Sequence, residues 1–288
     1  MAVKIVNALS RLLNRLHSRY KNRLRLGLSG YAQLFFYAFL FCYPSYSYAG
    51  PNLSGVVGGD ASAIVHTHGL TTEIHQNLNS VAIDWNSFNV NSNEIVNFVQ
   101  PDSSSIALNQ ILSTSASDIR GQINANGQIV LVNPNGIFFG ETASVNVGSL
   151  IASGLNISTT DFLNGDYIFN EVVGTDGFVI NSGLINASLG GLGGLGGGNV
   201  ALLGKQVTNE GIISAQLGSV NLAAGKAAVL RFDQQGLVGV QVTDAIIQDE
   251  LGLDPAVLNS GEINAQGGRF LLTASVSQAV FTSISHHV

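Results

Sequence analysis

Apolar and polar residues alternate along much of the chain, in short runs separated by Gly and Asn. Val81, Ile83 and Trp85 fall on one side of the first clear run. Further runs of the same kind follow, among them Ile129/Leu131, Val200/Leu202, Val220/Leu222 and Phe270/Leu272. Alternation with a period of two is typical of half-buried strands. The pattern therefore predicts an all-β chain of short strands joined by tight turns.

A repeat of the form N-x-G-x-I-x-A precedes three of these runs. Full copies begin at Asn181, Asn209 and Asn259, and residues 121–125 are a partial copy. The spacings are 209 − 181 = 28 and 259 − 209 = 50 residues, the second close to two periods of 25. Repeats of this length indicate stacked units that cannot bury their apolar side alone. Each unit is predicted to be one coil of a parallel β-helix.

In such a stack Ile and Val point inward in columns, while Ser, Asn and Gln point outward. Asn at the repeated turns is expected to bond the backbone of adjacent coils and to tolerate the left-handed conformation. Residues 50 to about 100 are irregular and are expected to cap the stack, with Trp85 and Phe88 in the cap. Coils are expected over about 101–285, with no equivalent C-terminal cap.

The first 49 residues read as a secretory signal peptide. Seven of the twelve basic residues precede residue 26, where no acidic residue occurs, and an apolar run from Leu26 to Tyr43 follows. Small residues then lead to an expected cleavage between Ala49 and Gly50. The apolar run is nearly long enough to span a membrane, so a transmembrane anchor is the alternative.

Removal of this segment leaves five basic and eighteen acidic residues, a charge of 5 − 18 = −13. A nucleic-acid-binding protein needs clustered Lys and Arg, which the chain lacks. No cysteine follows residue 49, so the exported part cannot form disulfides. Such a chain can cross an oxidising compartment without being locked by a disulfide.

The most distinctive turn is Asn133-Pro134-Asn135-Gly136-Ile137, between the apolar runs 129–132 and 137–139. Pro, Gly and Asn are the residues that fix tight turns. With Ile83-Asp84-Trp85-Asn86-Ser87-Phe88-Asn89-Val90 and the strand 127–132, this turn resembles the secretion domain of two-partner secretion (TPS) exoproteins, the filamentous haemagglutinin family. Its NPNGI signature is present letter for letter. The family's second signature, NPNL, is absent, and the chain looks closer to the high-molecular-weight adhesin branch.

The resemblance implies a fold and a function. The fold is a right-handed parallel β-helix with an N-terminal cap and extra-helical strands, over residues 50–288. The protein is expected to be a secreted, adhesin- or haemagglutinin-like exoprotein of a Gram-negative bacterium. An outer-membrane TpsB-type barrel with periplasmic POTRA domains would recognise the unfolded domain, which then folds outside. Asn133 and Asn135 are the residues expected to matter most for recognition and export.

The resemblance does not identify a host-cell or carbohydrate ligand. Adhesin activity in this family usually lies in long downstream repeats, so the chain is interpreted as a short, truncated or split exoprotein. The alternative function is a free-standing β-helix that binds or cleaves carbohydrate. Cleavage would need carboxylates on neighbouring rungs, whereas only Asp249-Glu250 are paired. No enzyme activity is therefore predicted.

Two further motifs are assigned structural roles, and no cofactor or metal is predicted. His66 and His68 would share one face of a strand, where they can bind a metal, but no third ligand is evident, so a surface strand is expected. Residues 191–196 match GxGxxG, yet a strand follows instead of the helix that a dinucleotide site requires. The Gly-rich run 190–198 is instead predicted to be a loop inserted at a coil corner.

Overall fold

A computed structural model describes residues 50–57, 63–187, 197–233, 236–244, 246–247 and 255–277. All of them belong to one compact unit, Tyr48–Val288. Several sequence-based predictions lie outside the described residues: the signal peptide with Ala49, the Gly-rich run 190–198 except its last two residues, and Asp249-Glu250. In the described residues no helix is long and apolar enough to cross a membrane.

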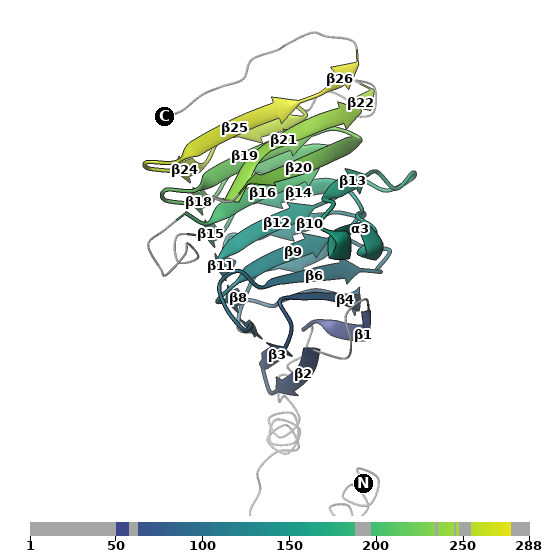
Figure 1. Ribbon diagram of the computed structural model, residues 1–288, viewed down its shortest axis with the longest axis vertical. Coiled ribbons are helices and arrows are strands. Elements are labelled where there is room, and N and C mark those ends of the chain that lie inside the picture. The colour runs from purple at the N-terminus through teal and green to yellow at the C-terminus, as the bar shows by residue number, and fades with distance from the viewer. Residues whose placement is uncertain are drawn as a thin grey trace, which may run out of the picture. The chain divides into compact units, whose positions relative to one another are not determined.

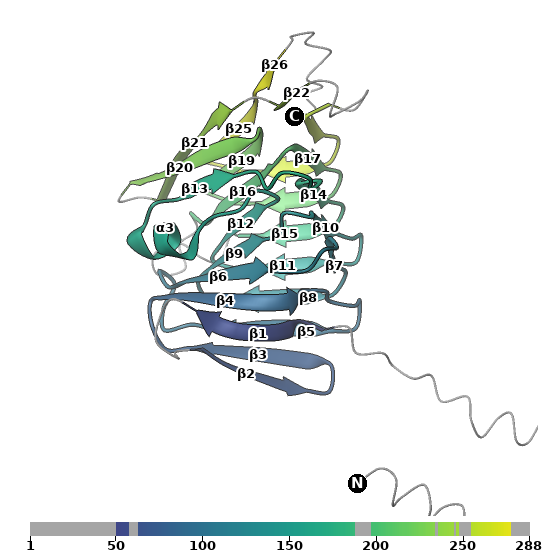
Figure 2. The same ribbon diagram turned by 90° about the vertical axis from the view of Figure 1, so that its right-hand side faces the viewer.

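Three sheets form the walls of a stack of coils, as Figures 1 and 2 show. Sheet A has the order β1 (Asn52–Val57), β4 (Ser80–Ser87), β6 (Ile106–Ile111), β9 (Gln128–Val132), β12 (Ser149–Ser153), β16 (Asn199–Gly204), β19 (Ser219–Ala224) and β25 (Arg269–Ala274).

Sheet B has the order β2 (Ala63–His68), β3 (Thr71–Gln76), β5 (Ile95–Val99), β8 (Gln122–Ala125), β11 (Ser144–Asn146), β15 (Leu184–Asn186), β18 (Ile212–Ser214) and β24 (Glu262–Asn264). Sheet C has the order β23 (Val257–Asn259), β17 (Gln206–Asn209), β14 (Phe178–Asn181), β10 (Ile137–Phe139) and β7 (Ser117–Ile119). The chain passes from B to A to C and then returns to B one level higher, which confirms the predicted parallel β-helix.

Inward apolar side chains stack in columns, as the alternation predicted. The register places Val96, Ile123, Val145, Ile185 and Ile213 above one another in sheet B, and all five are fully buried. The repeat isoleucines Ile185 and Ile213 thus occupy equivalent positions in successive coils. Burial of such side chains stabilises the fold by about 1.5–3 kcal/mol each.

The outer face of sheet A differs from the predicted polar exterior. Most of its outward side chains are apolar, and they form a second core with residues of the extra-helical segments. Those segments are α3 (Thr159–Asn164) and a sheet of β13 (Ile168–Asn170), β20 (Ala227–Asp233) and β21 (Gly236–Asp244). Leu108, Val130 and Leu203 are buried from this side by residues such as Phe162 and Phe169. The outer layer explains why sheet A is apolar on both faces.

The extra-helical segments also correct the interpretation of the long repeat spacing. The chain leaves the stack after β19 to form β20 and β21, and β23 returns directly onto β17, with Asn259 paired to Asn209. The 50-residue spacing is therefore one coil plus an excursion, not two coils. The same happens between β12 and β14, where α3 and β13 are inserted. The two excursions meet in the β13–β20 pairing and in the Glu171–Lys226 ion pair of 3.7 Å.

The N-terminal end is closed by antiparallel strands. β1 pairs antiparallel with β4, and β2 pairs antiparallel with β3. From β3 and β4 onward the pairing along sheets A and B is parallel, so the stack begins near residue 71, earlier than the expected start at about 101. Trp85 belongs to the coil strand β4 and is fully buried. Its ring packs edge-on against the Phe88 ring, with the ring centroids 5.2 Å apart. The short strands β22 (Ile246–Ile247) and β26 (Val276–Ser277) pair near the other end.

Candidate functional site

The NPNGI residues form the turn between β9 and β10, at the corner where the chain passes from sheet A to sheet C. The Gly136 N–H donates to the Asn133 carbonyl over 2.9 Å and closes the turn. The Asn135 N–H donates to the Asn133 Oδ1 atom over 3.0 Å, which is an Asx turn. The turn therefore has the local geometry that its residue types predicted.

Asn133 is fully buried and joins this corner to its neighbours. Its Nδ2 atom donates to the Ser115 carbonyl over 3.1 Å and to the Ser117 Oγ atom over 3.0 Å, both in the preceding coil. Its backbone N–H donates to the Ser153 carbonyl over 3.0 Å, in the following coil. The side chain thus acts within the turn and between coils, whereas the sequence indicated only the turn.

Asn135 and Pro134 make two more contacts between coils. The Asn135 Nδ2 atom donates to the Ser113 carbonyl over 2.8 Å, and the side chain is half-buried. The Pro134 carbonyl accepts from the Gly177 N–H over 2.9 Å. The corner is thus hydrogen-bonded to the coil on either side of it.

Gly136 and Ile137 are held by packing. Gly136 has a φ of +109°, and a Cβ atom there would lie 2.4 Å from the Phe178 ring. Any other residue would be strained by the backbone and would clash with Phe178. Ile137 is fully buried and pairs with Ser117 on one side and Val179 on the other. Every motif residue except Pro134 thus makes contacts that depend on its identity, whereas Pro134 contributes through its backbone carbonyl.

An exposed apolar side chain and a few charged groups lie near the turn. Leu112 is 57% exposed in the preceding corner. The charged residue nearest in sequence is the exposed Glu141. In the preceding coil Asp118 and Arg120 pair over 3.0 Å at half-exposed positions, and the guanidinium carbon of Arg120 lies 5.5 Å from the centre of the Phe138 ring. The motif itself contains no ionisable side chain. The five motif residues therefore supply no ionisable group, and their contacts are those of a structural corner.

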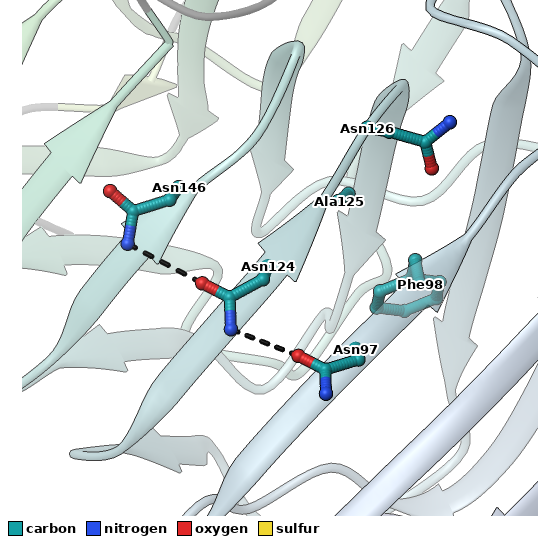
Figure 3. A pocket seen from close by; sticks show the side chains of 6 residues that line it. All are labelled: Asn97, Phe98, Asn124, Ala125, Asn126 and Asn146. Atoms are coloured by element: carbon teal, nitrogen blue, oxygen red, sulfur yellow. Dashed lines mark hydrogen bonds between the residues drawn. The ribbon is translucent and has the colours of Figure 1, made fainter.

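Asparagines also form two ladders along the stack. Inside, Asn181, Asn209 and Asn259 are joined amide to amide over 2.7 Å at each step. On the outer face of sheet B, Asn124 donates to Asn97 over 2.9 Å, and Asn146 donates to Asn124 over 3.5 Å (Figure 3). The outer ladder borders a shallow groove of about 450 Å³. Its sequence signal is the Asn before the final Ala of the repeat, as at Asn124 and Asn186.

The repeat asparagines do not use the left-handed conformation that was expected of them. In the described residues Leu217 is the only residue other than glycine with positive φ. Asn181 instead accepts from the Gly183 N–H over 3.2 Å and donates to the Gly183 carbonyl over 3.3 Å. The buried side-chain amide of Asn181 thus holds the corner by bonding both backbone groups of Gly183, and the asparagine itself keeps a negative φ.

Comparison with known proteins agrees with this geometry. A family model described as the TPS secretion domain matches residues 51–283, which include the coils and the NPNGI corner. The chain belongs to this family. The TPS secretion domain is a domain of exported, adhesin-like exoproteins and not an enzyme family, and it is recognised by a transporter partner.

Individual proteins are similar to part of this chain. The heme/hemopexin-binding protein of Haemophilus influenzae is 33% identical over 227 residues, which are 75% of this chain and 24% of the relative. The HMW1 secretion domain of Haemophilus influenzae matches with a TM-score of 0.64 and 27% identity, over 77% of this chain and 55% of that chain. The filamentous hemagglutinin secretion domain matches with a TM-score of 0.44 and 14% identity, over 78% and 99% of the two chains. The chain therefore spans about a quarter of the length of the heme/hemopexin-binding relative.

Proposed function

We propose that this TPS domain directs export of its exoprotein through a dedicated outer-membrane barrel of the TpsB type. The periplasmic POTRA domains of the barrel recognise the TPS domain. The observation that carries the proposal is the family match over residues 51–283 together with an intact NPNGI corner. The route begins with a signal peptide cleaved between Ala49 and Gly50, crosses the periplasm and ends outside the cell. The absence of cysteine after residue 49 suits this route.

We further propose that the transporter reads the NPNGI segment before the domain folds. In the folded domain Asn133 is fully buried, and both its amide nitrogen and its amide oxygen have partners. A side chain with no exposed surface, whose donors are already used within the fold, is not accessible to a second protein. The side chain is accessible only while the coils are unstacked, and its bonds form when the domain folds outside.

The test is export of variants with the partner barrel present. Asn133→Ala and Asn135→Ala are expected to reduce the secreted protein strongly while synthesis and signal-peptide removal continue. Ser117→Ala is the control for loss of one hydrogen bond at this corner, because it removes the Asn133–Ser117 bond without altering the motif. Gln128→Ala, at an outward position of β9, is the neutral control.

The comparison of Asn135→Ala with Ser117→Ala separates recognition from folding. Each of these variants removes one side-chain hydrogen bond, at about 0.5–1.5 kcal/mol, so they should be destabilised to a similar order. Asn133→Ala removes three side-chain bonds and should be destabilised more. If recognition reads the motif, only the asparagine variants lose export. Equal export of all four variants would show that the corner is purely structural and would remove the proposed role of Asn133 and Asn135.

A further inference from the structure

The hairpin of β2 and β3 gathers four potential metal ligands on its outer face. The antiparallel register places His66 opposite Glu73 and Ile64 opposite His75. Residues directly opposite share a face, and His68, two residues beyond His66, shares it too. The sequence showed the pair His66-x-His68 without a third ligand. The fold supplies Glu73 and His75 from the neighbouring strand.

The four side chains are close together and reachable from solvent. The His66 ring centroid lies 6.2 Å from that of His75, with the rings at 68°, and 6.4 Å from that of His68. The Nε2 atom of His75 lies 3.4 Å from the Glu73 Oε2 atom, and each of these two side chains is 43% exposed. His66 is the centre of the cluster, because it is within ring contact of both other histidines.

We propose that this face binds one divalent transition-metal ion through His66, His75 and Glu73, with His68 beside the site. Imidazole suits Zn²⁺, Cu²⁺ and Ni²⁺, and two imidazoles with one carboxylate form an established ligand set. Water molecules would fill the remaining positions at this exposed location. An ion held in this way joins the edge strand β2 to β3 and stabilises the N-terminal cap.

Binding requires rotation of side chains but no change of the hairpin backbone. In the ranges that the structure describes, no three His, Cys, Asp or Glu side chains are placed to hold a metal ion in their present conformations. Zn–N bonds of about 2.0–2.1 Å need the imidazoles closer than their present separation. The χ2 torsion of histidine is broad, and diagonal neighbours across an antiparallel pair are within reach of each other. The exposed rings can therefore turn toward a common ion.

The test uses the full chain and Zn²⁺ as the probe. Titration calorimetry is expected to show one saturable site in the wild-type chain. His66→Gln and His75→Gln should each weaken Zn²⁺ binding by about tenfold or more, since even loss of an outer partner of a metal ligand costs about that much. Glu73→Gln should weaken it, and His68→Gln should have a smaller effect than His66→Gln. Electron paramagnetic resonance with Cu²⁺ should show two coordinating nitrogens in the wild-type chain and one in His75→Gln.

The other three histidines of the chain, His17, His286 and His287, provide the control. The triple variant His17→Gln, His286→Gln, His287→Gln should bind Zn²⁺ as the wild type does. Circular dichroism of each variant checks that the β-structure is retained, as expected for exposed positions. The proposal is overturned by lack of a saturable site, by unchanged binding in both His66→Gln and His75→Gln, or by loss of binding in the triple variant.

Discussion

The Nδ2 atom of Asn209 donates to the Oδ1 atom of Asn259 over 2.7 Å, although the two residues lie 50 positions apart. Asn209 also accepts from Asn181 over 2.7 Å, so one buried ladder crosses three levels of sheet C. The contact exists because β23, the first stack strand after the excursion that follows β19, pairs with β17. A repeat separated by an insertion therefore keeps its register.

The first prediction concerns this ladder. Asn209→Ala removes the partner of the Asn181 amide nitrogen and of the Asn259 amide oxygen, and leaves both poorly bonded in the interior. We expect the free energy of unfolding to fall by about 3 kcal/mol, since a buried polar group without a partner costs about 1–3 kcal/mol. Urea denaturation of the purified domain measures the change.

Asn146→Ala is the control, because Asn146 belongs to the half-exposed outer ladder, where its amide contact with Asn124 is 3.5 Å. It should cost less than about 1 kcal/mol, because water replaces the lost partner. Equal losses in the two variants would contradict the distinction between an inner structural ladder and an outer one.

The second prediction concerns the stacked glycines between sheets B and A. A Cβ atom on Gly218 would lie 1.7 Å from the Gly198 carbonyl oxygen, which the backbone holds in place. Gly218→Ala should therefore force the two coils apart and lower the free energy of unfolding by about 2 kcal/mol or more. Gly239→Ala is the matched control, since a Cβ atom there meets nothing within 4 Å. Thermal unfolding followed by circular dichroism compares the two, and a stable Gly218→Ala variant would contradict the close approach.

The third prediction concerns pH. Burial raises the pKa of Asp84 above its ordinary value of 3.8, and in the described residues its Oδ1 atom is the one buried side-chain oxygen or nitrogen without a hydrogen-bond partner. A raised folded-state pKa means that stability is lost as pH rises through it, because the ionised form is disfavoured in the fold. Asp84→Asn should therefore be more stable than wild type at pH 7, and this advantage should shrink toward pH 3.5.

Asp102 provides the opposite case. Hydrogen bonds from the Ser104 side chain and backbone, and from the Ser105 side chain, lower the pKa of Asp102. The ionised Asp102 carboxylate therefore stabilises the fold at neutral pH. This stabilisation is lost as the pH falls below 3.8, the ordinary pKa of an aspartate. Asp102→Asn should thus be less stable than wild type at pH 7. Urea denaturation at both pH values tests the pair, and the same sign for both variants would contradict the assignment.

The fourth prediction uses Trp85, the only tryptophan of the chain. It is fully buried, and its Nε1 atom donates to the Asn109 Oδ1 atom over 3.0 Å. We expect blue-shifted fluorescence and little quenching by acrylamide in the folded protein. Asn109→Ala should leave the indole N–H unpaired and lower stability by about 1–3 kcal/mol. Emission like that of free tryptophan would show that the N-terminal end of the stack is open.

The sequence alone determined the strands, the repeating coil and the turn at Asn133–Ile137. These features depend on local patterns: alternation with a period of two, the N-x-G-x-I-x-A repeat, and turn residues whose backbone preferences are intrinsic. For the same reason the inward column with Ile185 and Ile213 could be expected. The family resemblance added the extra-helical strands, which the periodicity did not locate.

Only the tertiary structure decided which distant residues meet. The length between Asn209 and Asn259 is compatible with two coils or with one coil and an excursion. The fold adopts one coil and an excursion, because the excursion buries the apolar outer face of sheet A. Three partners of Asn133 lie in other coils, so its residue type predicted the bonds within the turn but not these three inter-coil bonds. His75 joins His66 only because the hairpin register sets them diagonally across two strands, and register is fixed by pairing and burial over the whole sheet.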